Sequence, residues 1–304
     1  MNSIALWIKA ARAPFLTGTI IPVLFGSTLA YCETGQFYWL MFFLALIGSV
    51  AAQAAANMAN DYFDHRTTDD DVNANYTPFS GGSRMIQDKL VTPRAMLIGA
   101  FAAWGIALAC GIYLFLHTPG YWVLIFAGLG FLGGFFYTAT RYAFAYNRVG
   151  ELSILACFGI LPIMGSYFVQ TGNFTWLSFW ASFPIGFLIT AILYVNEFPD
   201  YEADKSVGKN HLVVTLGKKW ARLGYYFLIF GNYVGVVLLV LFAGLTPWAL
   251  VALLSLPVAV KTVRIFTREY LNIKEFIPAQ AGTIQVHFLS GLLMSIGCII
   301  GAVV

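Results

Sequence analysis

The stretch NMANDYFDHRTTDDD, residues 57–71, places five aspartates directly after an apolar run that ends at Ala56. A second acidic stretch, NEFPDYEAD at 196–204, follows another apolar run in the same way. An aspartate at the centre of a membrane helix costs about 2.5–3.5 kcal/mol on insertion scales. We therefore expect these carboxylates at the ends of membrane helices, where they need an explanation in terms of function.

The composition of the whole chain indicates a membrane protein. Of its 304 residues, 59% are hydrophobic and only 10% are charged, and the mean hydropathy is +0.75. Soluble domains carry about 25% charged residues, so the sequence predicts an all-α integral membrane protein within the lipid bilayer. The net charge of +3 comes from few bases interleaved with acids, which gives no indication of nucleic-acid binding. The cysteines and histidines are scattered, without the spacing of disulfide pairs or metal ligands.

The apolar segments predict nine transmembrane helices, because a spanning helix needs about 20 apolar residues. The segments are 13–31, 39–60, 95–116, 121–140, 149–170, 176–197, 222–243, 247–265 and 282–303.

The charges sort to one side of this predicted topology. All 17 Lys and Arg fall at the N-terminus or after the second, fourth, sixth and eighth segments, and only Glu33 among the 14 acids falls on the other side. The positive-inside rule then places the N-terminus in the cytoplasm and the C-terminus on the opposite side. Two cytoplasmic connections, 61–94 and 198–221, are long and hold the acidic stretches.

The two acidic stretches resemble each other. Residues 60–64, NDYFD, align with residues 196–200, NEFPD, at the ends of two predicted helices that run in the same direction. This similarity is typical of a parallel internal repeat with a site between its halves, although five residues can also agree by chance. We predict one domain, 1–304, with four-helix halves at 13–140 and 149–265 and a final helix at 282–303.

The spacing within each stretch predicts a metal site. Carboxylates and carboxamides recur at i, i+4 and i+7 or i+8, so each set shares one helix face, provided that the second helix continues through Pro199. Hard oxygen ligands suit Mg²⁺, which proteins bind through one or two carboxylates plus substrate phosphates. Two facing sets suggest two magnesium ions that make a diphosphate a leaving group. The predicted metal ligands are Asn57, Asp61, Asp64, Asn196, Asp200 and Asp204.

Not every acid in these stretches needs such a role. For Asp69, Asp70 and Asp71, a solvated acidic loop is an equally good interpretation. Basic residues beside glycines in SGGSRMIQDKL (80–90) and DKSVGKN (204–210) are candidates for binding diphosphate oxygens, because glycine lets the backbone approach a ligand and Lys and Arg bind phosphates. The predicted diphosphate-binding residues are Asn60, Arg84, Lys89, Arg141, Lys205 and Lys209.

The motif pair NMANDYFD and NEFPDYEAD resembles the UbiA superfamily of intramembrane prenyltransferases. The stretches FSGGSRMIQ, GELSILACFGILPIMGSYFVQTG, NEFPDYEADKSVGKNHLVVTLG and GTIQVHFLSGLLM are similar to its 1,4-dihydroxy-2-naphthoate polyprenyltransferase branch. His211 departs from this pattern at a position where threonine is expected. Thr68 stands where some members have an aspartate, a role that Asp70 can take, and Arg141 replaces an expected Gly-Pro-like turn.

The resemblance implies a fold, a cofactor and catalytic residues. The fold is nine helices around a central cavity, capped by two long cytoplasmic loops, and two Mg²⁺ ions bridge a polyprenyl diphosphate. The residues that match the family's motifs, and that we expect to act in catalysis, are Asp61, Asp64, Asp200 and Asp204. Aromatic faces stabilise cations, and Tyr137 is the best candidate to face the allylic cation, ahead of Tyr62, Tyr142, Tyr146 and Tyr194.

The expected reaction transfers a polyprenyl group to an aromatic acceptor, with loss of diphosphate and, in the naphthoate branch, of carbon dioxide. It needs a dry cavity and no Ser, Cys or His nucleophile, and no obligate protein partner is evident. Another acceptor remains an alternative: 4-hydroxybenzoate, homogentisate, a chlorophyllide, a haem or a glyceryl ether lipid. An ion-coupled transporter is a third possibility, but its ionisable residues would be expected near the bilayer midplane.

Overall fold

The computed structural model describes residues 3–137 and 143–304, and within these residues every regular element is a helix. In chain order the elements are α1 Ser3–Ala10, η1 Ala13–Leu16, α2 Thr17–Thr34, α3 Trp39–Arg66, α4 Asp69–Val72, α5 Pro93–His117, α6 Trp122–Phe135, η2 Phe144–Tyr146, α7 Gly150–Ile154, the π-helical η3 Leu155–Ile160, α8 Leu161–Thr171, α9 Trp176–Ser206, α10 Leu212–Phe242, η4 Pro247–Ser255, α11 Leu256–Glu269 and α12 Ile273–Val303.

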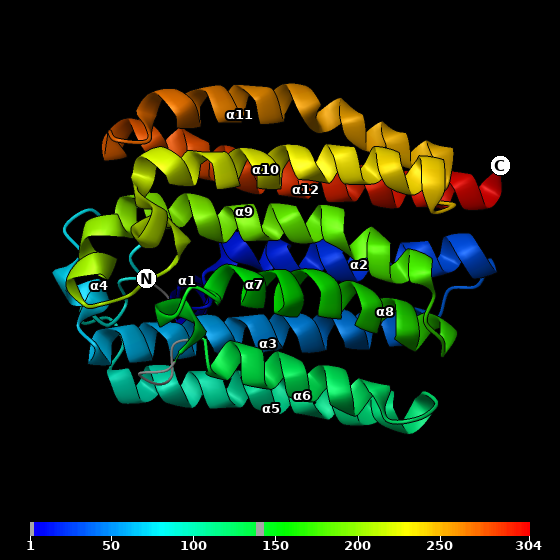
Figure 1. The fold of residues 1–304 in the computed structure, drawn as a ribbon. Coiled ribbons are helices and arrows are strands. Elements are labelled where there is room, and N and C mark those ends of the chain that lie inside the picture. Colours follow the sequence, from blue (N-terminus) through cyan, green and yellow to red (C-terminus); the bar gives the residue numbers. More distant parts are fainter. Residues whose placement is uncertain (1–2, 138–142) are drawn as a thin grey trace.

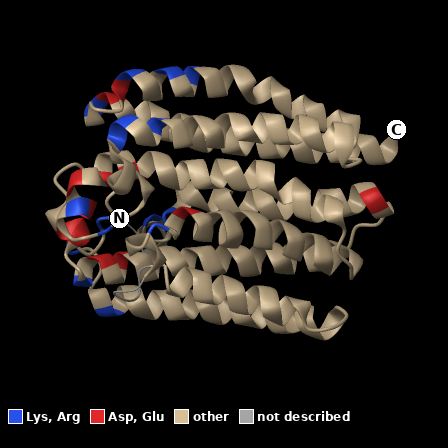
Figure 2. Ribbon diagram, viewed as in Figure 1, with Lys and Arg blue, Asp and Glu red and all other residues tan. Residues whose placement is uncertain are grey.

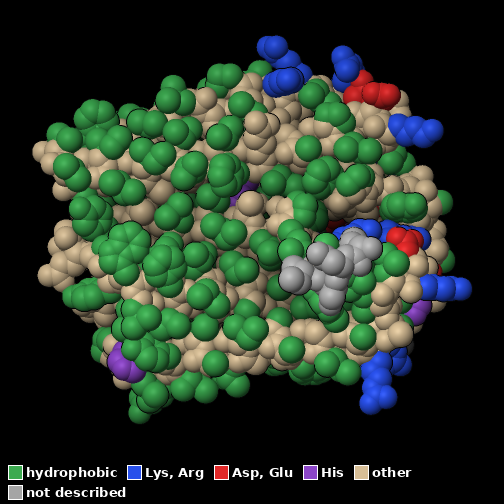
Figure 3. All heavy atoms as spheres, turned by 180° about the vertical axis from the view of Figure 1, so that it is seen from behind, with side chains coloured by type: hydrophobic (Ala, Val, Ile, Leu, Met, Phe, Trp, Pro, Cys, Tyr) green, Lys and Arg blue, Asp and Glu red, His purple; other side chains and the backbone are tan. Residues whose placement is uncertain are grey.

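The helices lie roughly alongside one another, with the chain crossing repeatedly from one end of the molecule to the other (Figure 1). In the described part of the chain, eight helical segments are long and apolar enough to cross a membrane, and α6 is a shorter apolar helix of 14 residues. Large apolar side chains cover the sides of the bundle (Figure 3). The predicted class, an all-α integral membrane protein, is confirmed, and the count of nine spanning helices stays a prediction.

Several helices extend beyond the apolar segments from which they were predicted. The helix expected at 39–60 is α3, which continues to Arg66, and the helix expected at 176–197 is α9, which continues through Pro199 to Ser206. The prediction of a long second loop at 198–221 was therefore wrong: this region is helical except for 207–211 and a break at Gly217. Hydropathy marks where side chains stop being apolar, whereas backbone hydrogen bonding continues into the polar turns.

The helix α9 lies at the centre of the bundle and is buried along most of its length. It packs against α10, α12 and η3, while α2 packs against α8 and α12, and α3 packs against α5. The contact with η3 is close: a Cβ added to Gly159 would lie 2.5 Å from the Cα of Gly186. The two glycines thus let the backbones of η3 and α9 approach.

Most charged residues lie at the end of the bundle where α3 and α9 end (Figure 2). All buried carboxylates in the described part of the chain lie at this end, on α3, α4, α7 and α9. Glu33 lies in the last turn of α2, at the opposite end. The structure thus concentrates buried charge at one edge of the apolar bundle and leaves the rest of the helices to pack through apolar contacts.

Candidate active site

A cavity of about 190 Å³ lies between the charged ends of α3 and α9. Its polar wall contains most of the predicted site residues, and its other wall is apolar. The predicted residues that line it are Asn57, Asn60, Asp64, Tyr137, Asn196, Asp200, Asp204 and Lys209. The apolar lining includes Phe15, Ala56, Ile154, Phe158, Ile189, Ile192 and Leu193. One cavity can therefore hold both a charged group and an apolar chain.

At the end of α3, the two predicted aspartates have different surroundings. Asp61 is held by the guanidinium of Arg12 and by the hydroxyl and backbone N–H of Ser83, the latter at 3.1 Å, and it does not line the cavity. Asp64 accepts a hydrogen bond from the Asn60 carboxamide at 2.9 Å through Oδ2. Its other oxygen, Oδ1, is buried and has no hydrogen-bond partner.

Asn57 donates its carboxamide N–H to the carbonyl of Ala11 at 2.9 Å. This bond orients the side chain and leaves its oxygen as the atom that can act as a ligand. Arg12 also donates to the carboxamide oxygen of Asn60 at 2.9 Å. The segment before α2 therefore fixes the first acidic set from one side.

At the end of α9, each predicted residue is held by a different segment. Asp200 accepts from the Asn73 carboxamide at 2.7 Å and from the backbone N–H of Gly81 at 3.3 Å. Asn196 accepts from Gln280 of α12 at 2.9 Å through its carboxamide oxygen. Long-range contacts of this kind orient both side chains before any ligand arrives.

Asp204 is held by two basic groups. Lys209 Nζ lies 3.2 Å from one carboxylate oxygen, and His211 Nε2 lies 2.8 Å from the other. Burial alone would lower the pKa of His211, but Glu197 and Asp204 raise it to about 10. His211 also caps the N-terminus of α10, so the residue that departs from the family pattern ties the second acidic set to the next helix.

The interpretation of Asp69 and Asp70 as members of a solvated loop was wrong. Both begin the short helix α4 and are buried, whereas Asp71 is exposed and pairs with His65 at 3.0 Å. Burial raises the pKa of both buried carboxyls. Thr68 adopts a left-handed conformation, with φ 63°, that turns α4 back towards the site.

The connection after α4 closes tightly over Asp70. Gly82 has φ +76°, and a Cβ at this position would lie 2.1 Å from Oδ2 of Asp70. That oxygen is buried and has no hydrogen-bond partner. Because only glycine accepts both the positive φ and the close approach, Gly82 lets the chain pass beside a carboxylate that is free to bind a cation.

The predicted basic residues separate into one central lysine and several peripheral groups. Lys209 Nζ lies 2.6 Å from Asp69, 3.2 Å from Asp204 and 3.9 Å from Asp64. Burial would lower the pKa of Lys209, but these carboxylates raise it well above its ordinary value. Lys209 therefore links α3, α4 and α9 as a charged group.

Three of the other predicted bases, Arg84, Lys89 and Lys205, do not line the cavity. Arg84 donates to the carbonyl of Asp70 at 2.6 Å and stacks over Tyr76 at 4.5 Å. It therefore stabilises the connection between α4 and α5. Lys89 and Lys205 are exposed. Arg141 lies outside the described residues, as does Tyr142 among the aromatic candidates.

Sequence reasoning missed Arg12 because bases before the first apolar segment, Lys9 and Arg12, fit the positive-inside rule without any further role. The backbone of Arg12 is left-handed, with φ 53°, at the junction of α1 and η1, and its side chain lines the cavity. Burial would lower the pKa of Arg12, but Asp61 and Asp70 raise it above its ordinary value. Arg12 is thus a second cation in the site.

Comparisons with known proteins identify the family and the fold. Residues 19–277 match the UbiA prenyltransferase family. The chain is 31% identical to a 1,4-dihydroxy-2-naphthoate octaprenyltransferase of Bacillus subtilis (strain 168), covering 97% of this chain and 92% of that protein.

Solved structures share the fold. A UbiA homolog from Aeropyrum pernix K1, in its apo form, superposes with a TM-score of 0.70 at 16% identity, covering 93% of this chain and 97% of that one. A UbiA homolog from Archaeoglobus fulgidus bound to GPP and Mg²⁺ superposes with a TM-score of 0.63 at 14% identity, covering 94% and 99%. The chain therefore belongs to the UbiA prenyltransferase family and is an integral, multi-pass membrane prenyltransferase.

Proposed function

We propose that the protein transfers a polyprenyl group from polyprenyl diphosphate to 1,4-dihydroxy-2-naphthoate in a Mg²⁺-dependent reaction of menaquinone biosynthesis. Diphosphate and carbon dioxide are the other products. The similarity to the octaprenyltransferase of Bacillus subtilis supports the acceptor, and the Archaeoglobus fulgidus homolog bound to GPP and Mg²⁺ supports the donor and the metal. The charged end of the bundle faces the cytoplasm in this proposal, as the positive-inside rule predicts.

One observation carries the proposal: two acidic helix ends, far apart in the sequence, face one cavity that is otherwise apolar. Buried carboxylates are all negatively charged and repel one another unless cations lie between them. Oδ1 of Asp64 and Oδ2 of Asp70 are buried without a hydrogen-bond partner, and all the proposed ligand atoms are hard oxygens. This donor set fits Mg²⁺.

The metal ligands in this proposal are Asn57, Asp61, Asp64, Asn196, Asp200 and Asp204. Bound Mg²⁺ would neutralise the diphosphate and improve it as a leaving group. Lys209 and Arg12 add fixed positive charge at the polar wall, where the diphosphate oxygens would lie. Arg12 and Ser83 both contact the Asp61 carboxylate in this structure. Asp61 therefore acts as a ligand only if it binds the metal while keeping one or both of these contacts.

The apolar wall of the cavity holds the prenyl chain and excludes water. The carbon–oxygen bond of the donor breaks with its electron pair on the diphosphate, and the allylic carbon is left electron-poor. Tyr137 lines the cavity, so its ring can face this centre. An electron pair of the acceptor ring forms the new carbon–carbon bond, and the carboxylate leaves as carbon dioxide, returning its bonding pair to the ring.

A turnover assay tests the proposal. Purified protein in detergent receives geranylgeranyl diphosphate and 1,4-dihydroxy-2-naphthoate, with either Mg²⁺ or a chelator. We expect Mg²⁺-dependent formation of prenylated product, pyrophosphate and carbon dioxide together. Pyrophosphate without prenylated product would contradict the acceptor and direct the assay to the other aromatic acceptors. No pyrophosphate from a folded protein with any donor would contradict the proposed reaction.

A further inference from the structure

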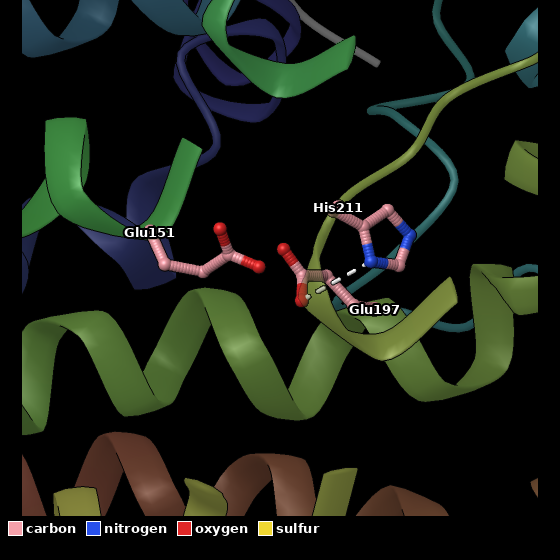
Figure 4. Close-up of side chains that lie close together, drawn as sticks. All are labelled: Glu151, Glu197 and His211. Atoms are coloured by element: carbon pink, nitrogen blue, oxygen red, sulfur yellow. Dashed lines mark ion pairs between the residues drawn. The ribbon is translucent and has the colours of Figure 1, made fainter. Parts of the chain in front are cut away.

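A second polar cluster adjoins the diphosphate ligands but has no role in the reaction derived above. It consists of Glu151 on α7, Glu197 on α9 and His211 at the start of α10, all three buried. One possible ligand atom from each residue lies within 4.8 Å of the other two. Figure 4 shows Glu197 between the other two side chains, with the Glu151 carboxylate directed towards it.

The carboxylates of this cluster are incompletely paired. Glu151 uses Oε1 to accept from the backbone N–H of Leu212 at 2.7 Å, while its Oε2 is buried without a hydrogen-bond partner. Oε2 of Glu197 also makes no hydrogen bond and lies 3.4 Å from His211 Nδ1. The side chains are at least nine-tenths buried, with exposed fractions of 5% and 6% for Glu151 and Glu197. Leaving buried carboxylate oxygens unpaired is costly.

The imidazole of His211 is oriented as metal-binding imidazoles are. Its Nε2 lies 2.8 Å from the Asp204 carboxylate, so an Nε2–H would donate to Asp204 and leave Nδ1 as the ligand atom. Histidines that bind metals almost always donate their other ring N–H to a carboxylate or carbonyl in this way. Among the described residues, Nδ1 lies 3.4 Å from Glu197 and accepts one long hydrogen bond, from the Val214 backbone N–H at 3.4 Å, which a bound cation would displace.

From this arrangement we infer that Glu151, Glu197 and His211 form a binding site for a divalent transition-metal cation such as Zn²⁺. Imidazole and carboxylate groups both bind Zn²⁺, and zinc sites with three protein ligands keep a further position open. Glu197 and His211 line the cavity, so the open position faces the space where substrates bind. An imidazole ligand favours a transition metal over Mg²⁺, which separates this site from the all-oxygen diphosphate site.

The two metal sites share a side chain at their border. Asp204 belongs to the diphosphate ligands and also holds His211 from behind. A cation on Nδ1 of His211 would therefore occupy the place of a ring proton and keep the positive charge between Glu197 and Glu151. Without a metal, His211 is protonated between Glu197 and Asp204, so a transition metal binds by displacing the Nδ1 proton and its affinity rises with pH.

The test is a titration with Co²⁺ alone, in place of Zn²⁺, without substrates. The full-length protein is purified in detergent without a polyhistidine tag and stripped with a chelator. We expect visible d–d absorption from a bound Co²⁺ that Zn²⁺ displaces and excess Mg²⁺ does not. Glu151→Gln and Glu197→Gln, which preserve side-chain shape, should each weaken this binding by about 100-fold or more, beyond the 10–100-fold typical of outer-sphere changes.

Two matched controls keep the result specific. Asp64→Asn alters the diphosphate site and should retain the Co²⁺ spectrum, and Glu33→Gln at the far end of the bundle should retain it as well. Circular dichroism and the thermal transition establish that each variant is folded. The inference is overturned if the folded wild-type protein binds no Co²⁺, if both glutamine variants bind it unchanged, or if Asp64→Asn abolishes the binding.

Discussion

The ends of α3 and α9 carry similar sets of amide and carboxylate groups, yet they are held in different ways. On α3, Asp61 is paired with a charged group, Arg12, and Asp64 keeps a buried oxygen free. On α9, Asp200 is held by neutral donors, whereas Asp204 is held by Lys209 and His211. The first aspartate is paired with a base on α3, whereas on α9 it is the second aspartate that two basic groups hold.

The contacts that these two sets make show that neither helix end is a site by itself. The connection between α4 and α5 donates to both: Ser83 holds Asp61 on α3, and Asn73 and Gly81 hold Asp200 on α9. Lys209 contacts carboxylates of α3, α4 and α9. The two ends therefore form one electrostatic unit, and substitutions on either side should affect the same step.

The largest expected effect comes from removing one ligand charge at each end. Asp64→Asn and Asp200→Asn keep side-chain size but remove a carboxylate that lines the cavity. Each should lower turnover by on the order of 10²–10³-fold, the cost of losing one preorganised group that stabilises transition-state charge. Pyrophosphate release in saturating Mg²⁺ measures this. Asp71→Asn, in the same acidic stretch, serves as the control, and wild-type turnover in either test variant would contradict the two-ended site.

The next effect is on stability and tests the link between the two ends. Lys209→Met leaves Asp64, Asp69 and Asp204 without their shared cation, and breaking a buried ion pair on one side costs about 3–5 kcal/mol. Its side chain is 14% exposed, which places the loss at the lower end of that range. The thermal unfolding midpoint in detergent should fall clearly, while Lys205→Met, which alters an exposed neighbour, should leave it unchanged. Equal midpoints for the two variants would refute the linking role.

A smaller effect is expected from the groups that hold Asp61. Arg12→Gln and Ser83→Ala remove donors to a proposed ligand without removing the ligand itself. Loss of such outer-sphere partners typically costs 10–100-fold in metal affinity or activity. The dependence of turnover on Mg²⁺ concentration should shift to higher concentration in both variants. If that dependence stays at the wild-type position, Asp61 is not held for a metal.

The smallest effect concerns the basic residues that the structure leaves outside the cavity. Lys89 and Lys205 are exposed, and an exposed charge contributes about 0–1 kcal/mol to an interaction. Lys89→Met and Lys205→Met should therefore change the KM for the prenyl donor by about fivefold at most. A much larger increase, with kcat unchanged, would show that these lysines move to the diphosphate when it binds.

The helical periodicity of the sequence predicted that the acidic and amide residues of each stretch share one helix face. In the structure every predicted metal ligand except Asp61 lines one cavity. What it could not predict are partners brought together by tertiary folding. Arg12 lies 49 residues from Asp61, and Lys209 lies 140 residues from Asp69. No local pattern encodes these separations.

Two further features could not be predicted from the sequence, because they too depend on the folded structure. The burial of Asp69 and Asp70 depends on a left-handed turn at Thr68, a conformation that a threonine rarely adopts. The cluster around His211 depends on Glu151, which lies in an apolar segment whose polar contacts only the folded structure reveals. Helix ends were also misjudged where polar residues continue a helix beyond its apolar core.

The most direct test of a single site shared by both helix ends is the binding of a non-reactive thiodiphosphate analogue of geranylgeranyl diphosphate, measured by calorimetry in detergent. We expect this binding to require Mg²⁺ and to be lost alike in Asp64→Asn and Asp200→Asn, because one metal-bound diphosphate needs both helix ends. Binding that survives a chelator, or that persists in one of the two variants while the other loses it, would contradict a single site built from α3 and α9.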